Sequence, residues 1–129
     1  MSRRHYITAL IVILLTALLL AGCKPQTPNG LPARIEVYGS ARTAETIRFR
    51  HQGHGQNLDN VELPWHYDFE IDLDDVVSLY ATSDDAGSLR CRLLVTHQGV
   101  SSTVSSDVAP SGRFKSVSCG GRWIGFRYE

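Results

Sequence analysis

The sequence predicts an all-β domain, a small antiparallel immunoglobulin-like β-sandwich that follows a cleaved N-terminal leader. From Arg34 onward, apolar residues alternate with charged ones at a period of two, which is typical of half-buried strands. Turn signals recur about every 8 to 12 residues, and no segment after the leader has a helical period. Two spaced cysteines, Cys91 and Cys119, complete the pattern of such a sandwich. A small closed barrel is the alternative.

The N-terminus has the order of an export leader. Residues 3–5 are basic, residues 7–20 are apolar but too few to span a bilayer comfortably, and two small residues precede Cys23. This order resembles the bacterial lipoprotein signal, whose cysteine is diacylated through its sulfur before the leader is removed. We therefore expect a leader at 1–22 and a lipidated Cys23, with a retained membrane anchor or a secretory leader cut elsewhere as alternatives.

A lipid on Cys23 would attach the protein to a membrane of the cell envelope. The expected place is the outer face of the cytoplasmic membrane, or the outer membrane if the cell has one. Loss of the leader leaves about 107 residues, enough for one domain with a modest core. It also leaves 11 basic against 13 acidic side chains, a balance of −2, so nucleic acid is not an expected partner.

The three cysteines form an odd number, which is awkward in an oxidising compartment unless one is otherwise occupied. Lipidation occupies Cys23, so Cys91 and Cys119 are expected to form a disulfide after export. The closed loop of roughly 28 residues is worth about 3.5 kcal/mol in the chain-entropy model. Two metal thiolates are the competing interpretation, but no Cys or His lies nearby at the spacing of zinc ligands.

The first elements follow from prolines and alternation. Three prolines in residues 24–32 indicate a tether, so we place the tether at 23–33 and the sandwich at 34–129. Strands are expected near 34–38 and 46–50, with the following residues facing the core: Ile35, Val37, Ile47 and Phe49.

The clearest alternation covers residues 61–73, where every odd position is apolar and the even positions are mostly acidic. Because Pro64 cannot donate to a strand ladder, a bend or an edge position is expected near Leu63 to Trp65. The parity of Trp65 favours a core residue over an exposed recognition aromatic.

The remaining segments predict an antiparallel meander. Strands are expected near 77–81, 89–95, 100–106 and 114–119, with turns at 83–87, 98–99 and 109–112. The parity of 89–95 places Cys91 on the buried face. Residues 120–129 either add a final strand or form an exposed contact patch.

Five short motifs occur in a distinctive order: Ile35-x-Val37-Tyr38-Gly39, Leu63-Pro64-Trp65, Leu79-x-Ala81, Cys91-Arg92-Leu93-x-Val95 and Val117-x-Cys119. Together they resemble the MmpS family, the mycobacterial membrane protein small proteins and their actinobacterial relatives, over roughly residues 33 to 119. The resemblance implies an extracytoplasmic β-sandwich with a Cys91 to Cys119 bridge. It also implies an accessory subunit of an RND-type transporter of the MmpL class, which exports lipids, siderophores or drugs.

Two features depart from that family. Its members commonly carry a retained transmembrane helix where this chain has a lipobox, and their usual Asp-Gly turn is here Thr96-His97-Gln98-Gly99. The lipobox would give the domain a lipid anchor in place of a packed helix.

Acidic residues are dense after Trp65, with five carboxylates at positions 68, 70, 72, 74 and 75. Alternation places Asp68, Glu70, Asp72 and Asp74 in a line on an exposed face, whereas calcium loops fold their ligands around one point. We therefore expect the stripe to pair with Arg48 and Arg50 across strands, or to contact a partner, and not to bind a metal.

Two other groups are candidate sites. His51 and His54 lie in the Gly-rich segment 51–55, where two imidazoles are too few for a tight metal site and a polar turn is expected. Trp123, Phe126 and Tyr128 lie beyond the matched motifs and are candidates for a partner contact.

The sequence lacks the motifs of the common enzyme classes. It contains no Gly-x-Ser-x-Gly, phosphate loop, dinucleotide fingerprint or zinc-ligand pair, so neither an enzyme nor a cofactor is expected. The expected function is that of a membrane-attached, non-catalytic binding subunit. The alternative is a free-standing envelope lipoprotein that binds a ligand or metal, or inhibits an envelope-attacking enzyme.

Overall fold

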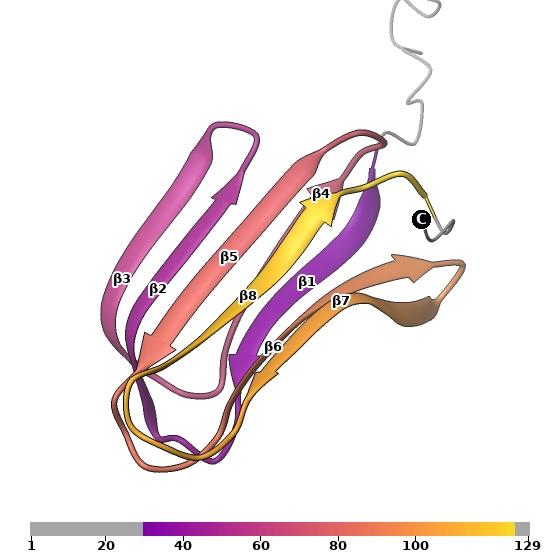
Figure 1. The fold of residues 1–129 in the computed structure, drawn as a ribbon. Helices are drawn as coiled ribbons and strands as arrows, with labels where there is room; N and C mark the ends of the chain where they lie inside the picture. The colour runs from indigo at the N-terminus through magenta and orange to yellow at the C-terminus, as the bar shows by residue number, and fades with distance from the viewer. Residues whose placement is uncertain (1–29, 126–129) are drawn as a thin grey trace, which may run out of the picture.

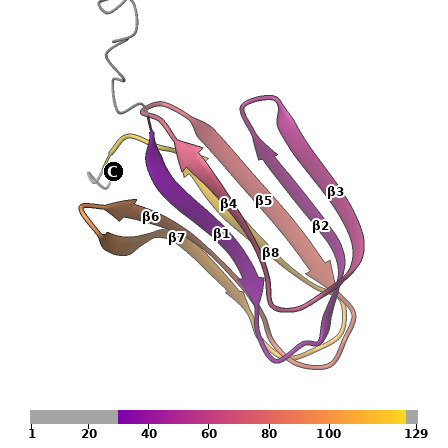
Figure 2. The same ribbon diagram turned by 180° about the vertical axis from the view of Figure 1, so that it is seen from behind.

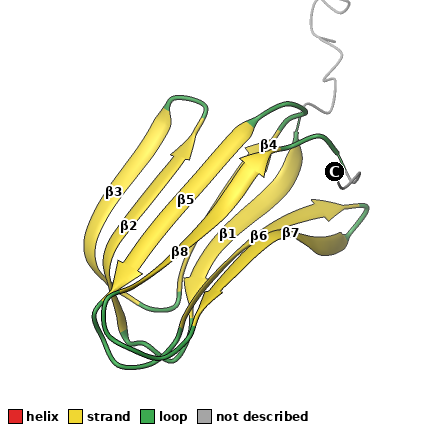
Figure 3. Cartoon of the chain, viewed as in Figure 1, coloured by secondary structure: helices red, strands yellow, loops and turns green. Residues whose placement is uncertain are grey.

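The computed structural model describes residues 30–125, which form eight β-strands and contain no helix (Figure 3). The strands are β1 (Leu31–Tyr38), β2 (Thr43–His51), β3 (His54–Glu62), β4 (Trp65–Ile71), β5 (Val76–Ser83), β6 (Leu89–His97), β7 (Val100–Ala109) and β8 (Lys115–Arg122). The predicted leader and Cys23 lie outside the described residues. Within residues 30–125, no helix has the length and apolar character to cross a membrane.

Two four-stranded antiparallel sheets form the layers of a sandwich, which confirms the predicted architecture over the closed barrel (Figures 1 and 2). One sheet has the order β4-β1-β6-β7, and the other has the order β3-β2-β5-β8. The described part therefore has eight strands, one more than a constant-type immunoglobulin domain.

The strand connections differ from the predicted meander. Among successive strands, β2 pairs with β3 and β6 pairs with β7, while every other connection crosses from one sheet to the other. The expected hairpin at Gln98-Gly99 is present, since His97 pairs with Val100. The last strand, however, pairs with β5 and not with its predecessor β7.

The core lies between the sheets and follows the predicted alternation. Fully buried side chains come from both layers, for example Ile35 and Val37 from β1 and Ile47 and Phe49 from β2. Burial of each such side chain contributes about 1.5–3 kcal/mol. Phe49 also packs on Tyr67 and Phe69, with ring centroids 5.2 Å and 5.4 Å away.

The long alternating run is divided at Leu63-Pro64, near the place where a bend or an edge position was expected, and the peptide bond between these two residues is cis. Residues before the break belong to β3 at the edge of one sheet, and residues after it belong to β4 at the edge of the other. Pro64 thus removes no ladder hydrogen bond from either strand. Leu73 is 67% exposed, contrary to its parity, because it lies in the β4–β5 loop beyond the end of the sheet.

The predicted disulfide joins the two layers. Cys91 of β6 and Cys119 of β8 are bonded, with their Cα atoms 6.1 Å apart. Two further bonds hold β8 against β7: Ser118 N donates to Asp107 Oδ2 at 2.9 Å, and Gly120 N donates to Ser105 Oγ at 3.0 Å. The sandwich is therefore tied together along its β6, β7 and β8 side.

The N-terminal boundary of the sandwich lies slightly earlier than predicted. β1 begins at Leu31, which pairs with Ile71, so residues 31–33 belong to the first strand. Gly30 packs near Asp72 and Glu70, at the end of the sandwich that carries the β4–β5 loop (Figures 1 and 2). We call this end the entry end.

Candidate functional site

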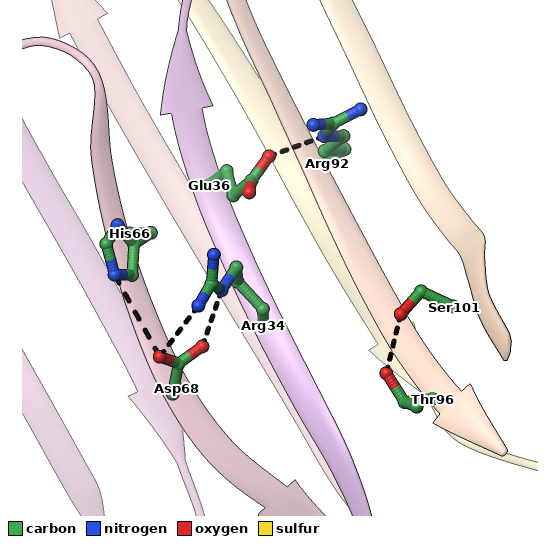
Figure 4. Close-up of polar contacts among 7 residues, drawn as sticks. All are labelled: Arg34, Glu36, His66, Asp68, Arg92, Thr96 and Ser101. Atoms are coloured by element: carbon green, nitrogen blue, oxygen red, sulfur yellow. Dashed lines mark hydrogen bonds and ion pairs between the residues drawn. The ribbon is translucent and has the colours of Figure 1, made fainter. Parts of the chain in front are cut away.

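The outer surface of the β4-β1-β6-β7 sheet, which we call the A face, carries alternating charges. Outward positions of β1 supply Arg34 and Glu36, and the neighbouring strands place an opposite charge beside each one. Figure 4 shows these side chains pointing toward one another across the sheet. Side chains of opposite charge that lie directly across neighbouring strands stabilise the pairing of those strands.

The first group joins β1 and β4. Arg34 Nε donates to Asp68 Oδ1 at 2.6 Å, and Arg34 Nη2 donates to Asp68 Oδ2 at 3.1 Å, a bidentate arrangement. His66 Nε2 lies 3.9 Å from Asp68 Oδ2. The hydrogen bonds from Arg34 hold the pKa of Asp68 below its usual range, and the same pair raises the pKa of Arg34.

The second group joins β1 and β6. Arg92 Nε donates to Glu36 Oε2, and the Arg92 guanidinium lies 5.1 Å from the centre of the Tyr38 ring. The hydrogen bond with Glu36 is the largest cause of a raised pKa at Arg92. Both ionic groups are thus formed within the domain itself.

A hollow of about 620 Å³ opens at one end of the A face, opposite the entry end. Its walls include aromatic and charged side chains, among them Tyr38, Trp65, His66 and Arg90. Arg90 has no ion pair within the described residues. An exposed arginine beside two aromatic rings is a composition that favours binding of a protein or an organic ligand.

The backbone of the hollow depends on a close approach between two loops. Gly39 has φ +144°, and a Cβ there would lie 2.2 Å from the carbonyl oxygen of Ser88. The hydroxyls of Ser40 and Ser88 lie 3.2 Å apart, and Ser88 N donates to Ser40 Oγ at 2.8 Å. These contacts fix the rim of the hollow.

Trp65 has two environments. It is half-buried and packs against the core, as its parity predicted, and it also lines the hollow. Parity alone could not detect the second role, because the strand begins at Trp65 and leaves its side chain at the edge of the sandwich.

The predicted acidic stripe lies on an exposed surface, but the prediction that it pairs with Arg48 and Arg50 is wrong. Asp68 pairs with Arg34, whereas Arg48 and Arg50 belong to β2 in the other sheet. Alternation shows which residues share a face, but it does not show which strands become neighbours. Glu70 and Asp72 are exposed.

The histidine segment also differs from a simple polar turn. His51 is the last residue of β2 and is buried, while His54 begins β3 and is exposed. His51 Nε2 lies 2.9 Å from Asp75 Oδ2, and its ring centroid lies 4.8 Å from that of Phe69. Within residues 30–125, no group of three or more His, Cys, Asp or Glu side chains could hold a metal ion.

Asp75 forms the centre of a buried polar cluster that the sequence analysis missed. Its carboxylate accepts hydrogen bonds from Gln52 Nε2 and from Asp72 N, the latter at 2.8 Å. Burial raises the pKa of Asp75, but the bonds from the Asp72 backbone, His51 and Gln52 outweigh that effect and lower the pKa overall. One signal was present: Asp75 shares the inward parity of Val77 and Leu79.

Trp123 is not the exposed contact residue that was expected. It is 8% exposed and belongs to the core. Its backbone bonds to the β4–β5 loop: Trp123 N donates to Asp75 O at 2.8 Å, and Asp74 N donates to Trp123 O at 2.7 Å. The other two aromatic candidates, Phe126 and Tyr128, lie outside the described residues.

Comparison with protein families gives one assignment. The family model described as Mycobacterium membrane protein matches residues 23–112. The chain belongs to this family. The match covers every strand of the β4-β1-β6-β7 sheet and ends before β8. Comparison with curated proteins and with solved structures gives no match.

Membership in this family makes the chain a relative of membrane proteins. It confirms the MmpS-type resemblance seen in the ordered motifs. The A face, including its hollow, is formed entirely by residues within the family match.

Proposed function

We propose that the chain is a membrane-anchored, extracytoplasmic lipoprotein that acts as a non-catalytic accessory subunit of an RND-type exporter of the MmpL class. Residues 1–22 are the cleaved leader, and Cys23 carries the lipid. The anchor holds the sandwich on the outer face of the cytoplasmic membrane or on the outer membrane. The exported substrate is a lipid, a siderophore or a drug.

The observation that carries this proposal is the family match over residues 23–112. It begins at the cysteine of the lipobox and includes the whole β4-β1-β6-β7 sheet. The agreement between a membrane-protein family and a lipobox supports attachment to a membrane. The transporter partner follows from the MmpS-type resemblance.

The A face supplies a surface suited to a protein partner. Trp65, Tyr38 and Arg90 border its hollow, and Trp, Tyr and Arg are the residues most often found at the energetic centres of protein interfaces. The ionic groups of Arg34 and Arg92 already have partners, so little side-chain ordering remains to oppose association. We place the transporter contact at this hollow.

The bonding of the polar groups favours recognition over catalysis. The buried His51 is bonded to Asp75 at 2.9 Å, as a histidine base with an orienting carboxylate would be. Ser105, whose hydroxyl accepts the backbone N–H of Gly120, lies on β7 in the other sheet. A serine nucleophile needs a histidine base within hydrogen-bond reach and an orienting group behind it. The family is described as one of membrane proteins and not as an enzyme class.

Affinity purification of the full chain from its native membranes tests the proposal. A multi-span RND-type transporter is expected to co-purify, and a Cys23→Ser variant, which cannot be acylated, is expected to recover far less of it. A Trp65→Ala, Arg90→Ala variant tests the hollow while leaving the anchor intact. Recovery of only abundant envelope proteins with the wild-type chain would overturn the proposal.

A further inference from the structure

The outer surface of the β3-β2-β5-β8 sheet, which we call the B face, differs in charge from the A face. Its cations are Arg48 and Arg50, two residues apart on β2, and Arg122 at the end of β8. Their direct neighbours across the strands are uncharged: Asn57 and Tyr80 beside Arg48, Gly55 and Ser78 beside Arg50, and Val76 beside Arg122.

These three arginines have no carboxylate partner within residues 30–125. On the A face, by contrast, Arg34 and Arg92 each bond to a carboxylate, and Arg90, which is unpaired within the same residues, lies at the end of that face opposite the entry end. The nearest acidic residue of β3 on this surface is Asp59, opposite Thr46 and farther from the entry end than Arg48. Unneutralised guanidinium groups on one surface attract an anionic partner.

The B face is also hollowed beside two of these cations, Arg48 and Arg50. A groove of about 460 Å³ is lined by Arg48 and Arg50, by the hydroxyl-bearing Ser78, Tyr80 and Ser118, and by two glycines. Gly120 has no side chain to cover the backbone at this point. No side chain would fit there, because a Cβ would lie 2.1 Å from the carbonyl oxygen of Val77. Guanidinium and hydroxyl donors around a shallow groove match the oxygens of a phosphate group.

Apolar side chains lie beside the cations. Val76 pairs with Arg122 and is 55% exposed, and Tyr80 pairs with Arg48 and is 44% exposed. Aliphatic and tyrosine side chains beside arginines are suited to the interface of a bilayer.

The chain enters the sandwich at the entry end, close to the start of β5. Gly30 lies beside Asp72. Asp72 is in the β4–β5 loop, four residues before Val76, the first residue of β5. From Cys23 to Gly30 the chain has seven residue steps, which extend at most roughly 25 Å. A lipid on Cys23 would therefore keep the entry end close to the membrane surface, whatever conformation those residues adopt.

We propose that the B face is the membrane-facing surface of the domain and binds the phosphate groups of anionic phospholipids through Arg48 and Arg50. This orientation rests on the lipid anchor proposed above, whereas the attraction of the B-face arginines to anionic lipids does not depend on it. In this arrangement the A face points away from the bilayer and is accessible to a protein partner.

Vesicle binding tests this proposal without the anchor. The protein is the predicted mature chain, 23–129, with Cys23→Ser so that no lipid can attach. The probes are vesicles of phosphatidylcholine alone and vesicles of phosphatidylcholine mixed with phosphatidylglycerol, read by co-sedimentation. The wild-type chain is expected to bind the mixed vesicles, to bind the neutral ones far less, and to release at high salt.

The decisive variant is Arg48→Gln with Arg50→Gln. Since each arginine near an anionic surface contributes about five-fold to partitioning, the pair is expected to lose roughly 25-fold. The matched control is Arg42→Gln with Arg113→Gln, which removes the same charge from the exposed β1–β2 and β7–β8 loops and should change binding little. Near-ultraviolet circular dichroism verifies that each variant is folded.

Three results would overturn the proposal. They are no binding of the folded wild-type chain to the mixed vesicles, an equal loss in both double variants, and displacement by inorganic phosphate beyond that by chloride at equal ionic strength. The last result would assign the groove to free phosphate. None of them would affect the transporter proposal, which is read by co-purification.

Discussion

Two single residues, Asp75 and Gly120, are each required by a close contact between parts of the chain that are distant in sequence. Asp75 is the buried last residue of the β4–β5 loop, and its carboxylate bonds to His51 and Gln52. Gly120 lies where β8 passes over the backbone of Val77, too close for any side chain. Each position is defined by a contact with a strand distant in sequence.

Replacement of Asp75 by Asn is expected to destabilise the fold by about 1–3 kcal/mol, because buried hydrogen bonds of a charged group are lost. Folding lowers the pKa of this carboxyl, so its contribution is present above the ordinary value of 3.8 and is lost as the pH falls through the lower folded-state pKa. Denaturant unfolding between neutral pH and pH values below 3.8 measures both effects.

The control for this prediction is Asp74→Asn, an exposed change in the same loop. It should leave stability and its acid dependence near those of the wild type, since the Asp74 contact to Trp123 uses the backbone N–H. Equal effects of the two variants would show that burial of the Asp75 carboxylate contributes nothing specific.

Gly120→Ala tests the close approach of β8 to β5. The backbone conformation, with φ +127°, costs about 1–3 kcal/mol for any other residue, and the clash with Val77 adds about 1–3 kcal/mol. Gly121→Ala has a similar φ of +140° but open space around its Cβ, so it should incur the conformational cost alone. Thermal unfolding of both variants gives the difference, and equal melting temperatures would refute the steric argument.

At the scale of elements, alternation correctly identified most strands and their buried faces. Ile35, Ile47 and Cys91 are buried as their parity predicted, and the break at Pro64 falls where it was expected. Periodicity reports only which residues share a face. It could not show that β8 pairs with β5, that Arg34 and not Arg48 meets Asp68, or that Trp123 closes the core.

The first part of β3 was missed for a different reason. His54 to Asn60 contain one large apolar residue, Leu58, because this edge strand has few contacts with the core and is polar along most of its length. The buried pair of His51 and Asp75 was hidden in the same way, since its two halves are 24 residues apart. Both features depend on tertiary neighbours that local patterns do not specify.

The disulfide is the covalent link between these elements. Replacement of Cys91 and Cys119 by Ala is expected to lower the free energy of unfolding by about 3.5 kcal/mol, because the unfolded chain regains the entropy of a 28-residue loop. Denaturant unfolding with and without reductant measures this. Reductant should bring the wild-type chain to the level of the variant and should leave the variant unchanged.

A count of free thiols tests the same disulfide in a second way. Denatured, unreduced mature protein should expose no reactive thiol, since Cys91 and Cys119 are bonded and Cys23 is expected to carry lipid. Reactive thiols from Cys91 or Cys119 in protein taken from its native compartment would contradict the structural role of the bond.

At the scale of the whole molecule, the two faces of the sandwich have different charge arrangements. The A face pairs Arg34 and Arg92 with carboxylates and offers a hollow lined by Trp65 and the unpaired Arg90, while the B face leaves Arg48 and Arg50 without acidic partners in the described part of the chain. A domain anchored at one end can use one face for the bilayer and the other for a protein. This division connects the proposed anchor, membrane surface and transporter contact.

Site-specific photo-cross-linking in intact cells tests the accessory role most directly. A photoreactive residue placed at Arg90, on the rim of the A-face hollow, is compared with one placed at the exposed Ser116 of β8. An adduct with a multi-span RND-type transporter is expected from position 90, and little or none is expected from position 116. Absence of a transporter adduct from position 90, or equal yields from both positions in membrane-anchored protein, would contradict the accessory role.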